Sequence, residues 1–258
     1  VYTFHKLAMR ILEENNIKFD ITDNETLERI INKYIYQDVL ESKKHYQAIL
    51  SFFNRKVKSL KEYKNFIYKN TDLVWEYEKL IAKYIRLFKC NGYDISYFKD
   101  IIKKDRWKFW KYKKKKDFVM VVLNIYLRYQ KYLEEEGELD FDDLIMRACE
   151  VVKNGGSIFK YKIIIIDEYQ DTSVIRFYLI REMLLRLECR YMVVGDDFQS
   201  IYRFTGCDLD LFINFKKYFL DGKILKIQNT YRNSQELIDI AGSFVMQNKR
   251  QINKELRS

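Results

Sequence analysis

Four consecutive isoleucines, Ile163 to Ile166, run directly into the acidic cluster Asp167, Glu168 and Asp171. A short apolar run bounded by charge is typical of a strand buried on both faces of a parallel sheet. In open α/β sheets, ligands bind just beyond the carboxyl ends of such strands. The acids are therefore predicted to stand at the mouth of a crevice, where a cation and its phosphate ligand can be held.

Strands and helices alternate along the chain after this run. Further strands are predicted at residues 190–197 and 223–228, and helices at 173–187 and 233–249. Alternation of this kind indicates βαβ units, in which neighbouring strands are parallel. The predicted fold class is therefore α/β, with a partial parallel sheet flanked by helices.

The chain before about residue 140 is predicted to be helical. A long helix is expected at 117–136, with Gly137 just past its end. Asp140 is placed to cap the next helix, and Asp143 lies in its first turn, where a carboxylate suits the helix dipole. The first helix shows one apolar face, made of Leu7, Ala8, Ile11 and Leu12.

The net charge is +10, from 47 Lys and Arg against 37 Asp and Glu. This surplus favours an anionic partner, nucleic acid first, although the chain is rich in Lys, Tyr and Ile throughout. Residues 103–117 carry nine bases and two acids, together with Trp107 and Trp110. This stretch fits duplex DNA, and it equally fits a solvated loop whose tryptophans fill the helical core.

Several classes of protein are disfavoured by composition. The apolar run Phe118–Leu127 is too short to span a bilayer and contains Asn124. The four cysteines show no paired spacing, and there are two histidines. No membrane partner, disulfide framework or histidine-based metal site is expected, and a reducing cytoplasm is the simpler location.

Three polar clusters follow the three predicted strands, at 167–171, 193–206 and 230–234. If the strands are parallel neighbours, the clusters converge at one edge of the sheet. Their residue types suit phosphoryl transfer: a carboxylate for Mg²⁺, a second carboxylate for water, an amide for the terminal phosphate and an arginine for developing charge. One cluster alone would more simply cap a strand, but three in this order favour the chemistry.

The clusters "DEYQD", "VVGDDFQSIYRF" and "TYRNSQELIDIA" resemble motifs II, III and IV of the UvrD/Rep/PcrA group of superfamily-one DNA helicases. "YTFHKLAMRIL" resembles the TFH motif of that family, and "LDFDDLIMRA" resembles the segment that returns from its helical insert. The resemblance covers nearly the whole chain, although the helical region matches by position and not by residue.

The resemblance implies a partial parallel RecA-like sheet of the P-loop NTPase type, with a large all-helical insert domain. Residues 1–12 would begin RecA-like domain 1A, residues 13–139 would form the helical 1B subdomain, and residues 140–258 would return to domain 1A with motifs II, III and IV.

The resemblance also implies roles at an ATP site. Asp167 would bind Mg²⁺, and Glu168 would be the general base for attack of water on ATP. Gln199 would contact the γ-phosphate, and Arg232 would be an arginine finger. The implied nucleotide contacts are Tyr231, stacked on adenine, and Gln170.

DNA contacts are implied at the TFH segment and in motif III, namely at Thr3, Phe4, His5, Tyr202, Arg203 and Phe204. The family typically has Tyr-Gly-Trp/Phe-Arg-Gly where this chain has Tyr-Arg-Phe-Thr-Gly, residues 202–206. Arg203 replaces a glycine, and Thr205 replaces an arginine that faces DNA. Either Arg203 supplies the missing positive charge or the contact is weaker; the sequence leaves both open.

The implied function is ATP-driven movement on single-stranded DNA, 3′ to 5′, with unwinding at single-strand/duplex junctions; repair or replication proteins are possible partners. No G-x-x-x-x-G-K-[ST] phosphate-binding loop occurs in the 258 residues, and the chain starts at Val1 inside a motif. We therefore expect a fragment that does not hydrolyse ATP usefully alone. The alternatives are a fragment of a RecB/AddA-type helicase–nuclease subunit and a non-catalytic nucleic-acid-binding module.

Overall fold

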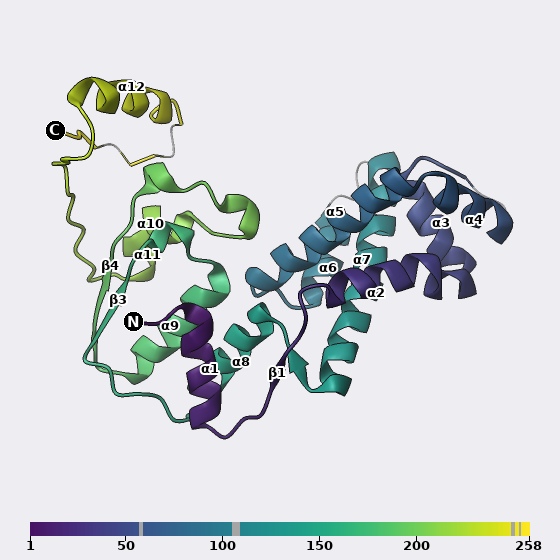
Figure 1. The fold of residues 1–258 in the computed structure, drawn as a ribbon, viewed down its shortest axis with the longest axis horizontal. Helices are drawn as coiled ribbons and strands as arrows, with labels where there is room; N and C mark the ends of the chain where they lie inside the picture. Colours follow the sequence, from purple (N-terminus) through teal and green to yellow (C-terminus); the bar gives the residue numbers. More distant parts are fainter. Residues whose placement is uncertain (57–58, 105–108, 249–250, 253) are drawn as a thin grey trace. The chain divides into compact units, whose positions relative to one another are not determined.

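The structure is a computed structural model that describes residues 1–56, 59–104, 109–248, 251–252 and 254–258. The chain separates into two compact units, Val1–Ser157, called here the helical unit, and Ile158–Ser258, called the α/β unit. Figure 1 shows the elements of each. The fold is mixed α/β and rich in helix, and the described residues form two small parallel sheets of two strands each.

The helical unit is built mainly from long helices, and several sequence predictions are confirmed there. The predicted apolar face of the first helix is buried at Ala8, Ile11 and Leu12. Gly137 has a positive φ of 70°, as expected of a residue just past a helix end. The helices are α1 (Phe4–Glu14), α2 (Thr26–Tyr36), η1 (Asp38–Glu41), α3 (Lys43–Phe52), α4 (Leu60–Lys69), α5 (Thr71–Cys90), α6 (Ser96–Lys104), α7 (Phe109–Glu136) and α8 (Phe141–Lys153).

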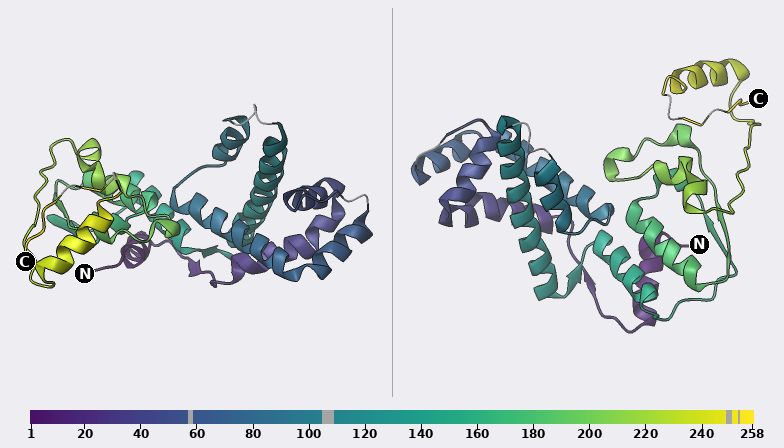
Figure 2. Two further views of the ribbon diagram at one scale, coloured as in Figure 1. Left: turned by 90° about the horizontal axis from the view of Figure 1, so that it is seen from above. Right: turned by 180° about the vertical axis from the view of Figure 1, so that it is seen from behind.

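Helix α7 is the central element of the helical core, and it contacts α2, α3, α5 and α6. Its length can be followed in both views of Figure 2. It begins at Phe109, earlier than the predicted residue 117, because lysine is a good helix former and the run Lys113–Lys116 continues the helix. The buried core of this unit runs from Leu27 to Leu133 and is rich in aromatic side chains.

A short parallel sheet marks where the chain leaves for the helical core and where it returns. Strand β1 (Asp20–Ile21) pairs with β2 (Glu138–Leu139), with Asp20 opposite Glu138 and Ile21 opposite Leu139. The sequence did not predict this sheet, because two residues are too few for a periodic signal. The core residues Leu27–Leu133 lie between the two strands in sequence, while α1 packs against α8.

A buried ion cluster joins α5 to the start of α8. The side chain of Lys89 is 5% exposed, and its Nζ lies 2.5 Å from Asp140 Oδ2 and 2.6 Å from Asp143 Oδ2. Asp140 is the N-cap of α8, as predicted, and its Oδ1 accepts the backbone N–H groups of Asp142 and Asp143. The Tyr129 hydroxyl of α7 also donates to Asp140 Oδ2, at 2.9 Å.

The α/β unit is built around two parallel strands, β3 (Ile163–Ile166) and β4 (Arg190–Val193), paired in register from one end to the other. One face is covered by aromatic side chains: the ring of Tyr191 lies 4.8 Å from Phe219 and 6.2 Å from Phe215. The helices of this unit are η2 (Tyr169–Asp171), α9 (Val174–Arg186), η3 (Asp197–Gln199), η4 (Arg203–Thr205), α10 (Asp210–Ile213), α11 (Phe215–Tyr218) and α12 (Gln235–Val245).

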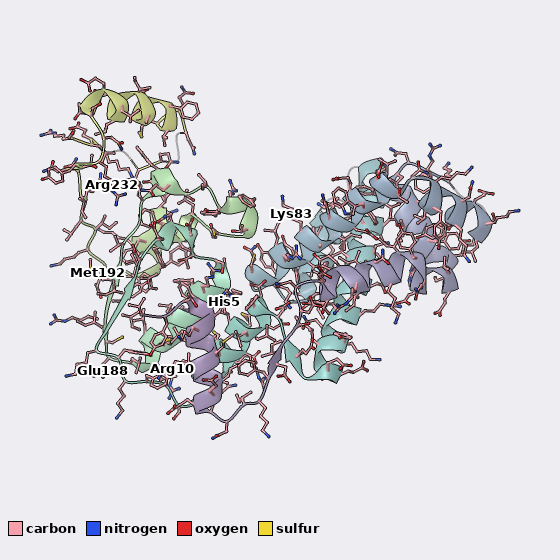
Figure 3. The ribbon with its side chains drawn as sticks, viewed as in Figure 1. His5, Arg10, Lys83, Glu188, Met192 and Arg232 are labelled. Atoms are coloured by element: carbon pink, nitrogen blue, oxygen red, sulfur yellow. The ribbon has the colours of Figure 1, made fainter. Side chains whose placement is uncertain are left out.

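Two predictions for this unit are wrong. The isoleucine run is not buried on both faces, since Ile163 and Ile165 are 56% and 64% exposed, and Met192 of β4 is also exposed (Figure 3). The reason is that no described element of the α/β unit covers this second face. Residues 223–228 are not a strand either; an isolated bridge joins Asn229 to Arg257 instead.

The predicted division at residues 12/13 and 139/140 remains a prediction. The structure separates at Ser157/Ile158, which groups α8 with α1 and with the helical core. Among the described residues, no helix combines the length and the apolar composition needed to cross a membrane.

Candidate nucleotide site

The carboxyl ends of β3 and β4 carry the first two polar clusters, and the structure brings these clusters together. Ile166 is opposite Val193, so both strands end at the same edge. Beyond the strands, the loops remain joined: Val194 N donates to Ile166 O at 2.8 Å, and Tyr169 N donates to Val194 O at 2.9 Å. The predicted convergence of these two clusters is therefore confirmed.

Glu168 occupies a left-handed backbone conformation directly after β3, with φ 51° and ψ 43°. For a residue other than glycine, this conformation costs roughly 1–2 kcal/mol. Strained backbone of this kind is concentrated at functional sites, where the surrounding structure enforces it. Asp167 and Glu168 are both exposed, and Asp167 Oδ1 accepts the Glu168 N–H at 3.0 Å.

Gln170 connects the two clusters through its side-chain amide. Its Nε2 donates to Glu168 Oε2 at 2.7 Å, and its Oε1 accepts the Asp196 N–H at 3.0 Å. The residue is 1% exposed, so both ends of the amide are used within the protein. A Cβ on Gly195 would lie 2.5 Å from Gln170 Oε1, which means that the bridge requires glycine at this position.

Asp196 and Gln199 form the next link of this chain of contacts. Gln199 is exposed, and its Nε2 donates to Asp196 Oδ2 at 2.9 Å. Burial alone would raise the pKa of Asp196, but hydrogen bonds from Lys254 and Gln199 outweigh it and hold the pKa below its usual value. By contrast, burial and then the charge of Glu168 raise the pKa of Asp171.

The third cluster does not reach the site through the sheet, because residues 223–228 form no strand. Tyr231 and Arg232 are both exposed, and Arg232 lies on the segment that leads into α12 (Figure 3). The contact that Arg232 makes is local: its backbone N–H donates to Thr230 Oγ1 at 3.4 Å. The structure therefore joins Asp167, Glu168 and Gln199 but does not place the Arg232 guanidinium against them.

The motif III residues that follow Gln199 form an exposed aromatic pair. The rings of Tyr202 and Phe204 are 6.2 Å apart and tilted by 48°, and Arg203 between them is exposed. Thr205 donates its hydroxyl to Tyr202 O at 2.7 Å. The threonine thus fixes the turn, and Arg203 is the exposed cation of this loop.

The remaining predicted DNA contacts belong to the helical unit. Thr3 caps α1 by accepting the Lys6 N–H at 3.2 Å, and His5 packs against the Phe141 ring at 4.7 Å. Phe4 begins α1 and is half-buried. These contacts explain the local structure of the segment; they leave its predicted DNA role untested.

The basic stretch at residues 103–117 is described only in part. Residues 105–108, which include Trp107, lie outside the described residues, as do the side chains from 109 to 112. In the described part, Lys113, Lys115 and Lys116 are exposed on α7. Duplex DNA binding and a core-filling role for the tryptophans both stay predictions.

A groove of about 780 Å³ lies elsewhere, between α2 and α5 of the helical unit. Its charges are largely paired: Arg86 contacts Glu28, and Asn32 donates to Glu78 at 3.3 Å. None of the residues predicted to act on nucleotide or DNA lines this groove.

Sequence reasoning missed the residues that connect the site internally. The nucleotide contact implied for Gln170 stays a prediction, and the bridge that its side chain makes between two loops was not foreseen. Asp196, Asp197 and Lys254 were given no role, yet Lys254 contacts both aspartates. The adjacent aspartates were a visible signal within motif III, but a single lysine 57 residues beyond Asp197 carries no local pattern.

Comparison with known proteins defines the class. Residues 1–220 match the family model of the UvrD/REP helicase N-terminal domain. The chain belongs to this family of DNA helicases.

Individual relatives agree with this assignment. "ATP-dependent DNA helicase Rep" from Buchnera aphidicola subsp. Acyrthosiphon pisum is 34% identical over 188 residues, which cover 70% of this chain and 28% of that protein. "ATP-dependent DNA helicase PcrA" from Bacillus subtilis is 31% identical over 141 residues, covering 53% of this chain and 19% of that protein. "DNA helicase IV" from Escherichia coli K12 is 34% identical over 127 residues, covering 49% and 19%. The matched part spans 19% to 28% of these relatives.

Proposed function

We propose that this chain is part of an ATP-driven helicase that moves 3′ to 5′ on single-stranded DNA and opens single-strand/duplex junctions. The supporting observation is the hydrogen-bonded series from Glu168 through Gln170 and Asp196 to Gln199, with distances of 2.7, 3.0 and 2.9 Å. It sets a carboxylate and an exposed amide at the carboxyl end of a parallel strand pair, where α/β sheets bind ligands.

The residues present fit Mg²⁺ that arrives with ATP. Among the described residues, no cluster of three or more His, Cys, Asp or Glu side chains could hold a metal alone. Mg²⁺ in nucleotide sites needs only one or two carboxylates, because phosphate oxygens and water supply the other ligands. The exposed Asp167 carboxylate would be that ligand, and the bound ion would neutralise phosphate charge.

Glu168 is the general base in this proposal. Gln170 fixes the carboxylate through Oε2, and no described hydrogen bond occupies Oε1, which can therefore accept a proton from water. Gln199 contacts the γ-phosphate, and Arg232 neutralises the charge that develops on it. Tyr231 stacks on adenine; Tyr231 and Arg232 are both exposed and can meet a bound nucleotide.

DNA is bound by exposed aromatic and basic groups. Tyr202 and Phe204 provide stacking surfaces, and Arg203 supplies the positive charge that the family places at residue 205. Thr3, Phe4 and His5 are further proposed DNA contacts, within the helical unit. The net charge of +10 favours this partner.

The test is Glu168→Gln in the protein encoded by the complete reading frame. Loss of a general base should reduce DNA-stimulated ATP hydrolysis by about 10²- to 10⁴-fold and abolish unwinding. Circular dichroism and nucleotide binding should be retained, since the substitution keeps the side-chain shape. Glu188→Gln is the matched control, because Glu188 is an exposed glutamate of the same unit (Figure 3) and should leave hydrolysis unchanged.

Normal turnover in the Glu168→Gln protein would remove this residue from the proposed role. A wild-type protein that binds DNA but does not hydrolyse ATP would instead favour the non-catalytic binding module. A nuclease domain encoded downstream would favour the helicase–nuclease alternative.

A further inference from the structure

Residues 251–258, of which 253 lies outside the described residues, form what is called here the clip segment. Residues 252 and 254 of this segment bind the motif III loop. Lys254 Nζ donates to carboxylate oxygens of both Asp196 and Asp197, the second at 2.7 Å. The ammonium lies 3.9 Å from the ring centroid of Phe198. The backbone N–H of Ile252 donates to the other oxygen of Asp197, at 2.7 Å.

The contact with Asp197 is not a loose surface pair. Asp197 is 1% exposed, so its carboxylate depends on these donors in place of water. Removing one partner of a buried ion pair leaves an uncompensated charge, which the protein relieves by moving or opening. The position of loop 196–199, and with it the Gln199 amide, therefore depends on Lys254.

At its other end the clip segment holds the motif IV segment on both sides of one turn. The Thr230 N–H donates to Arg257 O at 2.8 Å. Five residues later, Gln235 Nε2 donates to Leu256 O at 3.2 Å, and Gln235 Oε1 accepts the Ser258 N–H at 3.0 Å. These bonds fix the chain immediately before and after the exposed turn that carries Tyr231 and Arg232.

We propose that the clip segment couples the two loops, and that Lys254 is the positioning residue through which loop 196–199 and loop 228–235 move as one assembly. In the described part of the chain Lys254 contacts Asp196, Asp197 and the Phe198 ring, so in this proposal it acts through the positions of Gln199 and Arg232. This inference deepens the proposed function. Its expected effect on catalysis rests on the proposed function, whereas the coupling of the two loops does not.

The coupling can be tested in the 258-residue chain without any ligand, by amide hydrogen exchange. Lys254→Met should speed exchange by at least about tenfold in both 196–202 and 228–235, because local opening frees the amides of both loops. Exchange in β4 and α9 should stay as in wild type. Lys254→Arg keeps the charge and the donors and should restore protection. Lys216→Met is the matched control, since Lys216 is an exposed lysine of the same unit.

Gln235→Ala provides a second and milder variant at the opposite end of the clip segment. It removes the side-chain bonds to Leu256 and Ser258, and also the bond to Asp239 within α12, while leaving every described contact of Lys254 in place. If the loops are coupled, exchange in 196–202 also rises. Faster exchange confined to 251–258, or to the one loop that contacts or carries the substituted residue, overturns the proposal.

The consequence for catalysis is measured in the protein encoded by the complete reading frame. With wild type active, Lys254→Met should lower kcat for DNA-stimulated ATP hydrolysis by about 10- to 100-fold, since small misplacements at a reacting centre have effects of this size. KM for ATP should change less than threefold, and Lys254→Arg should recover kcat. An unchanged kcat, with wild type active, contradicts the inference; an inactive wild type contradicts the proposed function instead.

Discussion

Replacing Lys89 with methionine should destabilise the helical unit more than any change of a surface charge. The lysine lies between two carboxylates, Asp140 and Asp143, at 2.5 and 2.6 Å, and its side chain is 5% exposed. Methionine keeps much of the volume but removes the cation. The two aspartates, each about one-fifth exposed, would then face each other uncompensated.

The expected loss follows from this burial. Breaking a buried ion pair by removing one partner costs about 3–5 kcal/mol. For a unit of this size, that loss lowers Tm by about 6–20 °C, because each kcal/mol shifts Tm by about 2–4 °C. Adding Asp143→Asn removes one of the two uncompensated carboxylates, so the double variant should recover part of the loss.

The stability lost in the Lys89→Met variant should also depend on pH in a defined direction. Burial, partly opposed by the charge of Lys89, already raises the pKa of Asp143 in the folded protein. A carboxyl with a raised folded pKa binds protons more tightly when folded, so falling pH stabilises the fold. Loss of Lys89 removes the opposing charge and raises the pKa of Asp143 further. The free energy of unfolding that Lys89→Met removes should therefore be largest at neutral pH and should become smaller toward pH 5.

Tryptophan fluorescence gives a selective assay. All three tryptophans, Trp75, Trp107 and Trp110, belong to the helical unit, so their emission during urea unfolding reports this unit alone. Urea titrations at pH 7.5 and pH 5 give the two free energies of unfolding. A loss below about 1 kcal/mol at pH 7.5, the size of a surface pair, would refute the buried-cluster argument. Equal losses of unfolding free energy at both pH values would refute the predicted pH dependence.

Three further predictions concern two buried tyrosines, two glycines and the lysine run of α7. Tyr63→Phe should cost about 1–3 kcal/mol in urea unfolding, because the buried hydroxyl donates to a carbonyl in the last turn of α2 at 2.8 Å. Tyr77→Phe should be neutral or stabilising, since that buried hydroxyl has no partner among the described residues; an equal loss in both would contradict this. Gly195→Ala should cost about 1–3 kcal/mol, because its Cβ would lie 2.5 Å from Gln170 Oε1, whereas Gly242→Ala meets open space in α12 and should stabilise the helix. Changing Lys113–Lys116 to glutamine should reduce the salt slope of duplex DNA binding by about 0.9 for each phosphate that these lysines neutralise, and an unchanged slope would exclude DNA binding there.

The features that sequence predicted well are those with a local signal. The isoleucine run and the apolar segment before Gly195 predicted β3 and β4. Because the two strands pair in parallel, the acidic residues that follow them lie at one edge of the sheet. The predicted roles of Gly137 and Asp140 at helix ends were correct, because helix ends have specific residue requirements. The family was recognised from motifs that also lie at these strand and helix ends.

The features that sequence missed depend on contacts between distant residues. Residues 223–228 have the composition of a strand, but pairing depends on contacts with distant residues, and no described strand pairs with them. The exposure of Ile163 and Ile165 likewise depends on what covers the sheet, which the run itself does not encode. The left-handed backbone of Glu168 contradicts its own propensity, which is typical of positions where function overrides local preference.

The two-residue pairing of β1 with β2 has a consequence for how this part of the protein can change over time. Because Asp20–Ile21 lies alongside Glu138–Leu139, the stretch between them starts and finishes at neighbouring points. Helices within residues 22–137 can therefore lengthen or shorten as a cassette, provided that Lys89 stays beside Asp140 and Asp143. A chimaera that keeps both strands and a lysine at this place, and substitutes a foreign helical bundle elsewhere, should leave the packing of α1 on α8 intact.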